Sequence, residues 1–387
     1  MCGLFGLARP GQDGRPAAVV RAEVEALVML GVLAEERGTD AAGLAMWRGP
    51  ARAPGNTEAG ESGTARVRSI ARFTDVRVGG WRVIKRAGPF RRLPHQPGLA
   101  LDLTAARVVL GHTRWATQGA ARRVINASPL AVGRVLGTHN GDLDAERLAA
   151  SSAFPGPLGR RVGQTDSAVL FAGLDAAGSD RAAVLRLLAA VRGRAAVAWV
   201  DRTRAGTVWL ARAALSPLAV AETEDGAVFW ASNPDWLRRA GQHCGLTWRH
   251  VTMLPEGTLV RVRAGSGAVT LVGQWSFQPM ARRVDVRLAD LVVWRGFTRA
   301  DRDADQGALR HVVDSPPRSP WWSDSYRWPD GPDDLLREED LVGADARPRP
   351  GTDRWHDGWE GGWDDSDLWV DRRTSRGRAA AGAGEVA

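Results

Sequence analysis

The chain of 387 residues contains few cysteines, a single lysine and no long hydrophobic run. Its two cysteines, Cys2 and Cys244, are too few for a disulfide framework and lack metal-ligand spacing, which excludes a disulfide-rich secreted domain and a zinc module. No stretch of about 18 apolar residues could cross a membrane, and the amino-terminal segment lacks the basic and apolar regions of a signal peptide. We therefore expect a soluble, cytoplasmic protein without membrane contact, in which Cys244 is a small buried residue.

Because Lys85 is the only lysine, almost all of the positive charge is arginine, and the formal net charge is +8. Residues 271–387 carry 17 Arg against 22 Asp and Glu, so the front of the chain is basic and the rear is acidic. This asymmetry could steer an anionic ligand or let the tail fold back on the body; the alternative is arginines spread over a solvated surface. No dense basic run is interleaved with aromatic residues, which argues against nucleic-acid binding.

The composition of the chain changes near residue 275. Beyond that point it is rich in Asp, Arg, Pro, Gly and Trp but poor in aliphatic residues, and nine of the 17 tryptophans lie there, from Trp275 to Trp369. We predict a folded domain over 2–270 and a mostly disordered tail over 271–387. The tail tryptophans could dock a partner or pack on the body of the protein. A second irregular stretch, at 49–64, predicts a surface loop.

The front of the chain has a mixed α and β pattern. The segment "GLFGLA" behind Cys2 predicts a short strand, and apolar residues at helical spacing predict a helix over about 17–36. The runs "RVVLGHTRWAT" and "VGRVLGTHNGDL" predict strands that end in polar residues, and "QTDSAVLFAGL" predicts a helix that begins at Thr165 or Asp166. Further strands are expected in "AAVAWV", "TVWLAR", "PLAVAE" and "AVFWAS". Two sheets with helices outside would accommodate these elements.

Composition does not explain the position of Cys2 directly behind the initiator methionine. Methionine aminopeptidases remove an initiator that precedes a small residue, and this processing would give Cys2 a free α-amino group. An α-amine has a pKa of about 7.7–8.0 and a cysteine thiol of about 8.5, so one residue would carry both a nucleophile and a base. The amine could accept the thiol proton directly or through one water molecule. Cys2 is therefore a candidate catalytic nucleophile.

Four polar clusters follow downstream, each at the end of an apolar run. They are "RGTDAAG" with Arg37 and Asp40, "GHTRWATQG" with Arg114, Trp115 and Thr117, "THNGDL" with Asn140 and Gly141, and "QTDS" with Asp166. In this order, and together with Cys2, they resemble the class II glutamine amidotransferase domain, the cysteine branch of the N-terminal nucleophile hydrolases. The resemblance covers residues 2–265. It implies an α+β fold, a four-layer αββα sandwich of two mostly antiparallel sheets.

The resemblance also implies a role for each cluster. The thiolate of Cys2 would attack the side-chain amide of L-glutamine, with Arg114 gripping the α-carboxylate and Asp166 facing the α-ammonium. Asn140, through its side-chain amide, and Gly141, through its backbone N–H, would form the oxyanion hole. The products would be glutamate and ammonia, formed through a thioester without a metal or an organic cofactor.

The remaining residues of the clusters would support the site. Trp115 and Thr117 would line the pocket and its closing loop, while Arg37 and Asp40 would brace the surroundings of the nucleophile as a buried pair. His112 and His139 are expected to be structural.

Each residue also has a purely structural interpretation. Arg114 could be a surface arginine, Asn140-Gly141 a type I′ hairpin turn and Asp166 a helix cap. The joint order of the motifs with Cys2 favours catalysis.

The chain departs from larger members of the family in two ways. The tail is too short and too polar for a fused synthase, so we expect the ammonia acceptor to be a separate synthase subunit. Gln118 and Ser128 stand where the aminosugar-synthase branch has histidine, which argues against glucosamine 6-phosphate synthesis. Two alternatives stay open: a hydrolase of another γ-glutamyl amide or peptide, and a non-catalytic assembly or regulatory protein that acts through its tail.

Overall fold

The computed structural model describes residues 2–279, apart from 12–13, 50–65, 71, 79, 116–123, 157–164, 205, 215 and 266–268. Most of the loop predicted at 49–64, and the tail beyond residue 279, therefore lie outside the described residues.

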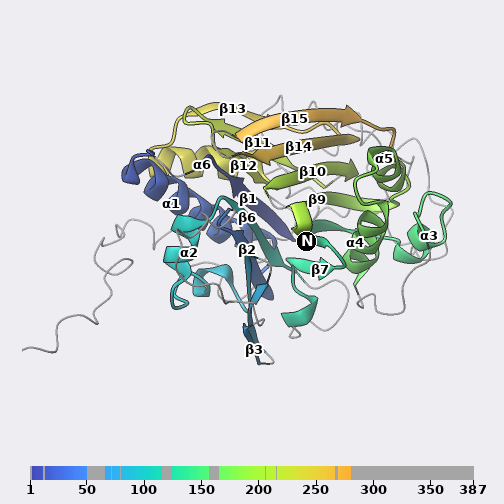
Figure 1. The fold of residues 1–387 in the computed structure, drawn as a ribbon, viewed down its shortest axis with the longest axis horizontal. Coiled ribbons are helices and arrows are strands. Elements are labelled where there is room, and N and C mark those ends of the chain that lie inside the picture. The colour runs from blue at the N-terminus through green and yellow to red at the C-terminus, as the bar shows by residue number, and fades with distance from the viewer. Residues whose placement is uncertain are drawn as a thin grey trace, which may run out of the picture. The chain divides into compact units, whose positions relative to one another are not determined.

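The first sheet has nine strands in the order β13-β11-β12-β1-β6-β2-β5-β4-β3, and every neighbouring pair is antiparallel (Figure 1). The predicted opening strand is confirmed as β1, and it lies near the centre of this sheet. The strands are β1 (Gly3–Ala8), β2 (Ala41–Trp47), β3 (Arg66–Ile70), β4 (Phe73–Val78), β5 (Trp81–Ala87), β6 (Val108–Arg114), β11 (Ala219–Thr223), β12 (Val228–Ala231) and β13 (Trp248–Met253).

The second sheet has six strands in the order β15-β14-β10-β9-β8-β7, again all antiparallel. They are β7 (Leu130–Val132), β8 (Val135–Leu143), β9 (Gly193–Asp201), β10 (Thr207–Ala214), β14 (Thr258–Ala264) and β15 (Val269–Ser276). The domain boundary expected at residue 270 falls inside β15. The sheet extends beyond it because Trp275 packs against Trp209 of β10, with ring centroids 5.9 Å apart, and so gives this last strand an apolar contact.

Helices cover the outer face of each sheet (Figure 1). On the first sheet, α1 (Ala17–Leu33) packs against α6 (Pro234–Cys244) and α2 (Leu99–Ala105). On the second sheet lie α3 (Ala145–Ala149), α4 (Asp166–Ala177) and α5 (Arg181–Ala189). The helix predicted over 17–36 is confirmed, although its last turn tightens into the 3₁₀ helix η1 (Ala34–Arg37). Shorter 3₁₀ turns are η2 (Phe90–Arg92), η3 (Val124–Asn126) and η4 (Arg202–Arg204).

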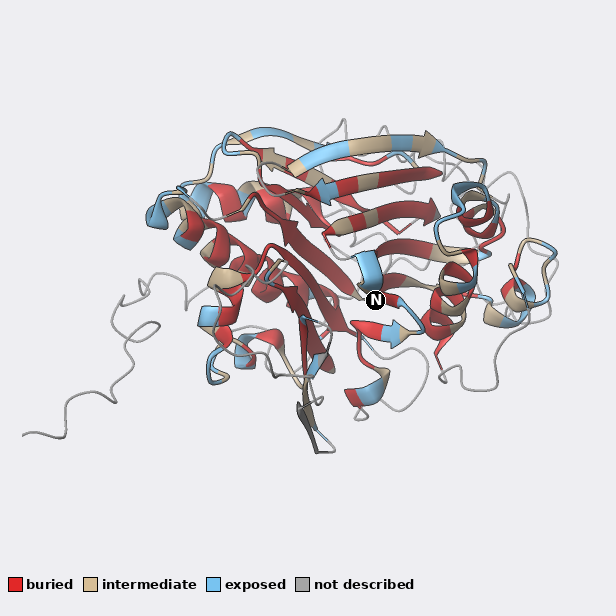
Figure 2. Cartoon of the chain, viewed as in Figure 1, coloured by how far each residue is buried: buried red, intermediate tan, exposed pale blue. Residues whose placement is uncertain are grey.

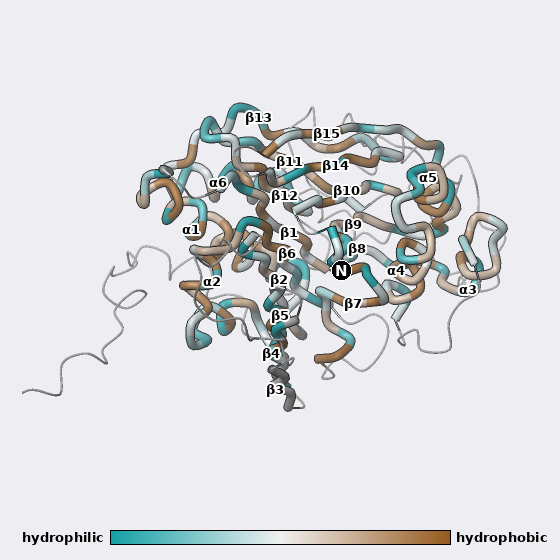
Figure 3. The backbone as a smooth tube through the Cα atoms, viewed as in Figure 1, coloured by the Kyte–Doolittle hydropathy of each residue, from teal (hydrophilic) through white to brown (hydrophobic). Residues whose placement is uncertain are grey.

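The two sheets face each other across a shared hydrophobic core. Leu4 and Leu110 of the first sheet and Leu136 and Val260 of the second belong to this core, and a separate core lies between the second sheet and α4 and α5. Figure 2 shows the central strands buried along their length, and Figure 3 shows hydrophobic residues concentrated on them. A strand covered on both faces need not alternate in polarity. The predicted α+β, four-layer αββα architecture is confirmed for the described residues.

The registers of three strands bring separate segments to one place. Gly3 at the start of β1 pairs with Thr113 near the end of β6, and Ala41 at the start of β2 pairs with Arg114. Cys2, the segment before β2 and the end of β6 therefore meet at one end of the first sheet.

Candidate active site

Cys2 is half-buried and lies immediately before β1. Its thiol donates a hydrogen bond to the backbone carbonyl oxygen of Trp115, with a sulfur to oxygen distance of 3.6 Å. The glycine behind it is sterically required: a Cβ on Gly3 would lie 2.6 Å from Thr113 Oγ1 and 2.7 Å from the carbonyl oxygen of Ala34. The Cys-Gly pair thus lets β1 pass beneath η1 and places the thiol beside the end of β6.

The surroundings of Cys2 keep its thiol protonated. Burial raises the pKa of the Cys2 thiol above its ordinary value, and this outweighs the lowering by the positive amino terminus and by Arg114. A thiol with a raised pKa needs a base nearby before it can act as a nucleophile.

Arg37 links Cys2 in the first sheet with Asn140 in the second. Its Nε donates to the carbonyl oxygen of Cys2 at 2.7 Å, and its Nη2 donates to Oδ1 of Asn140 at 3.4 Å. Arg37 is buried at the end of η1, whereas Asp40 is half-buried and donates its backbone N–H to the carbonyl oxygen of Arg114 at 2.9 Å. One guanidinium group therefore fixes the backbone next to the thiol and one end of the Asn140 amide.

The other end of the Asn140 amide is held by Ser232, which the sequence did not single out. Asn140 Nδ2 donates to Ser232 Oγ at 3.1 Å, and Ser232 is itself anchored to Leu4 by two hydrogen bonds of 2.9 Å and 2.8 Å. With Oδ1 facing Arg37 and Nδ2 facing Ser232, the orientation of the amide is fixed. An amide nitrogen has two hydrogens, so one remains for another acceptor.

Asn140 and Gly141 lie within β8, opposite Ala196 and Ala195 of β9. The alternative that this dipeptide forms a hairpin turn is therefore wrong. Gly141 has a φ of +153°, and a Cβ there would collide with the carbonyl oxygen of Arg194. Close approach of β9 explains why the strand carries a glycine at this position.

Asp166 is the first residue of α4, and its side chain is tied to the end of β8. Its carboxylate accepts hydrogen bonds from the backbone N–H groups of Leu143 at 3.1 Å and Ser167 at 2.8 Å. The helix is capped by the preceding residue, because the Thr165 side chain accepts from the N–H of Ala168. Thr165 therefore provides the N-cap that the sequence placed at either residue.

Arg114 is buried at the end of β6, within electrostatic range of three acidic groups. Burial lowers the pKa of its guanidinium, while Cys2, Asp40 and Asp166 raise it. Because Gly3 pairs with Thr113, Arg114 lies at the same end of the first sheet as Cys2. Trp115, the next residue, is 40% exposed.

The two histidines near the site are held by structural contacts. His112 Nε2 lies 3.0 Å from the carbonyl oxygen of His139, and burial lowers the pKa of His112 to about 3, so it is neutral. His139 Nδ1 lies 2.9 Å from Ser167 Oγ.

Four residues that the sequence singled out remain. Ser128 is buried beside β2, whose Gly43 it approaches through its carbonyl oxygen, and Thr117 and Gln118 lie outside the described residues. Cys244 is the last residue of α6 and is half-exposed, so the prediction that it is buried is wrong: the end of a surface helix leaves its thiol partly open to solvent.

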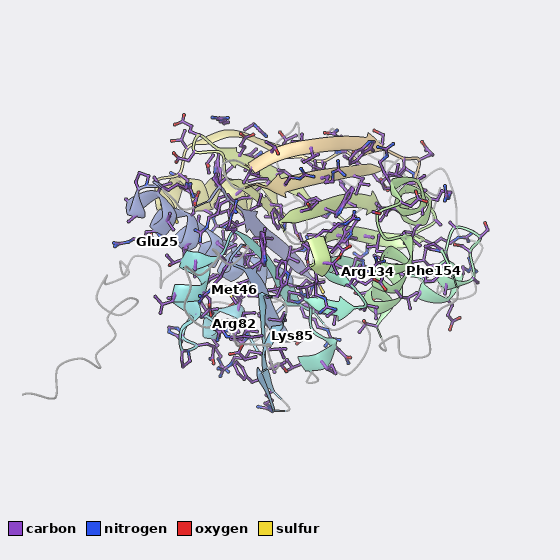
Figure 4. All side chains as sticks on the ribbon, viewed as in Figure 1. Glu25, Met46, Arg82, Lys85, Arg134 and Phe154 are labelled. Carbon is purple, nitrogen blue, oxygen red and sulfur yellow. The ribbon has the colours of Figure 1, made fainter. Side chains whose placement is uncertain are left out.

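Lys85, labelled in Figure 4, is a further buried cation. It belongs to none of the sequence motifs, and its being the single lysine is the one signal in the sequence that points to it. It is 8% exposed, and burial lowers its pKa to about 8. Within the described part of the chain its amine makes no hydrogen bond and no ion pair.

Replacing Lys85 by methionine should stabilise the protein at pH 7. The folded-state pKa of about 8 lies below the ordinary value of 10.5, so the folded state binds fewer protons between these pH values. Wild-type stability should therefore rise by about 3 kcal/mol from pH 8 to pH 10.5 relative to Lys85→Met. Urea unfolding of both proteins across this range measures the difference, and equal slopes would contradict it.

The described residues contain neither a metal-binding cluster nor a membrane-spanning helix. No three His, Cys, Asp or Glu side chains gather there in a group that could hold a metal ion. None of the helices in that part of the chain is long and apolar enough to cross a membrane.

Comparison with known proteins finds similarity in structure. No protein-family model and no curated protein sequence matches the chain. The structure is similar to glutamine phosphoribosylpyrophosphate amidotransferase from B. subtilis in complex with ADP and GMP, with a TM-score of 0.44 and 18% identity over 75% of this chain and 52% of that one. A structure described as the allosteric regulatory enzyme of purine biosynthesis gives a TM-score of 0.45 and 17% identity over the same shares. The chain thus spans about half the length of these proteins.

Proposed function

We propose that the protein hydrolyses the side-chain amide of L-glutamine to glutamate and ammonia through a thioester on Cys2. The observation that supports this most strongly is the bridge formed by Arg37, which joins the backbone of Cys2 to the side chain of Asn140. This bridge holds the Cys2 thiol and the oriented Asn140 amide next to each other. The charge of Arg114 acts on both Cys2 and Asp166.

The reaction begins with a proton transfer. Removal of the initiator methionine frees the α-amine of Cys2, which takes the thiol proton, and the thiolate attacks the carboxamide carbon. The oxyanion accepts hydrogen bonds from the remaining Nδ2 hydrogen of Asn140 and from the N–H of Gly141. The α-ammonium then gives its proton to the leaving nitrogen, which departs as ammonia. Water, deprotonated by the same amine, hydrolyses the thioester and releases glutamate.

The charges around Cys2 are suited to a free amino acid. The Arg114 guanidinium binds the α-carboxylate through its planar fork of donors, and Asp166 binds the α-ammonium. We infer that Trp115 lines the same site, a role that the resemblance implies for Thr117 as well. Arg37 supports the site without contacting the substrate. Asp40, which lies beside the Arg114 backbone, does the same.

Ammonia is a useful product only where a second reaction consumes it. We therefore infer that a separate synthase subunit accepts ammonia from this protein in the cytoplasm. The alternative is a hydrolase of other γ-glutamyl amides or peptides. Comparing the rates with L-glutamine and with γ-glutamyl peptides tests it.

The proposal is tested on the full chain with L-glutamine. We expect equimolar glutamate and ammonia, slower release from γ-glutamyl peptides, and no release from D-glutamine, whose α-substituents cannot face Arg114 and Asp166 together. A glutamine-like diazoketone should label Cys2, and mass spectrometry should show that the initiator methionine is absent. An active protein that retains this methionine would rule out the α-amine as base.

A further inference from the structure

The position of Lys85 in the first sheet places it next to the candidate active site. Lys85 of β5 pairs with Gly43 of β2, and Gly43 pairs with His112 of β6. These residues form one cross-strand row, and the neighbouring row contains Arg114 and leads to Cys2. With two strand spacings between them, the Cα atoms of Lys85 and His112 are roughly 10 Å apart.

The Lys85 row projects towards the second sheet. Directly opposed residues of an antiparallel sheet point to the same face. His112 shows which face this is, because its Nε2 contacts the carbonyl oxygen of His139 in β8. Leu4, which pairs with His112, belongs to the core between the sheets. The Lys85 amine is therefore directed into the layer between the sheets that also holds Asn140.

Two further buried polar atoms near this row lack hydrogen-bond partners. They are Nδ1 of His112 and Nδ2 of Asn126. Asn126 lies in η3, which packs against β4 and β5, and the chain continues from it to Ser128, whose carbonyl oxygen lies against Gly43. Buried polar groups in folded proteins almost always have partners. Two such atoms, close to a buried lysine that has no ion-pair partner among the described residues, indicate a place for a polar ligand.

The charges that surround the row favour an anion. The side chains that act electrostatically on the His112 ring are those of His139, Arg114 and Lys85, and none of them is a carboxylate. The carboxylates of Asp40 and Asp166 act on Arg114, whereas no carboxylate in the described residues pairs with Lys85.

The composition of the chain adds an independent argument. Of 52 basic residues, Lys85 is the only one that is not arginine. A lysine offers a compact, flexible ammonium in place of the rigid guanidinium fork. In a chain whose other basic residues are all arginine, the single lysine lies at a buried position directed towards the site.

We propose that Lys85 is a further ligand-binding residue, which together with the amide of Asn126 binds a carboxylate of the molecule that occupies the site beside Cys2. This inference rests on the proposed function. The carboxylate is either that of glutamine itself or a second one on a larger γ-glutamyl substrate; the ammonium and amide hydrogens recognise both in the same way.

The single lysine makes the test direct. Full chain carrying Cys2→Ala, to prevent turnover, is labelled with [¹³C,¹⁵N]lysine, which gives one side-chain resonance that disappears in Lys85→Met. The sample is titrated with L-glutamine, γ-glutamylglutamate, L-glutamine amide and acetate. We expect saturable shifts of the Lys85 resonance with a carboxylate ligand, none with L-glutamine amide, and at least tenfold weaker binding of that ligand to Lys85→Met.

The arms of the titration separate the possible outcomes. A shift with glutamine assigns the α-carboxylate, and a shift with γ-glutamylglutamate alone assigns a second carboxylate. If the Lys85 resonance does not shift, or if acetate at the same concentration causes the same shift, the proposed subsite is wrong. If Lys85 responds to these ligands but the wild-type chain releases no glutamate, the subsite stands and the proposed hydrolysis fails. If the wild type hydrolyses glutamine and Lys85 is silent, only the subsite fails.

Discussion

Replacing Cys2 by alanine abolishes glutamate release from L-glutamine, with an expected fall in kcat of about 10⁴-fold or more. The thioester cannot form without the sulfur, and no second nucleophile is proposed. Alanine is small enough to preserve the pairing of Gly3 with Thr113 and the hydrogen bond from Arg37 to the backbone carbonyl of residue 2. The measurement is the rate of glutamate formation, and binding of glutamine by calorimetry shows whether the site survives.

The matched control is Cys244→Ala. Partial burial raises the pKa of the Cys244 thiol to about 12, so little of it is thiolate at neutral pH. This variant should keep wild-type activity and wild-type labelling of Cys2 by the diazoketone. Activity that persists in Cys2→Ala but disappears in Cys244→Ala would reverse the assignment of the nucleophile.

The second large effect is expected for Asn140→Ala. Loss of one oxyanion donor typically lowers kcat by about 10²–10³-fold, and KM should change little because the amide faces the developing charge. The side chain is buried, so folding is checked by its melting temperature and by the rate at which the diazoketone labels Cys2.

Ser232→Ala distinguishes the orientation of the Asn140 amide from its role as a hydrogen-bond donor. It keeps Asn140 but removes the hydroxyl that receives Nδ2, so its loss of kcat should be smaller than that of Asn140→Ala. If Asn140→Ala folds and retains wild-type kcat, the oxyanion role is wrong. Equal losses in the two variants would show that Asn140 acts by holding Ser232 and β1 in place.

A structural feature could be predicted from the sequence where the residues that form it lie close together along the chain. The strands that contain Asn140 and Arg114 and the helix that begins at Asp166 could be predicted, because apolar periodicity and N-cap chemistry act within a few residues. The domain boundary expected at residue 270 falls inside β15. The place of β15 in the sheet depends on pairing with β14 and on the contact between Trp275 and Trp209.

By itself the sequence indicated which chemical groups the candidate site contains: the thiol of Cys2, the amide of Asn140 and the charges of Arg114 and Asp166. Only the tertiary structure decided their partners. Ser232 reaches Asn140, and Lys85 comes to lie two strands from His112, through strand order and register. Periodicity is a local property of the chain, whereas register is set by packing the two sheets and their helices together, which no local pattern encodes.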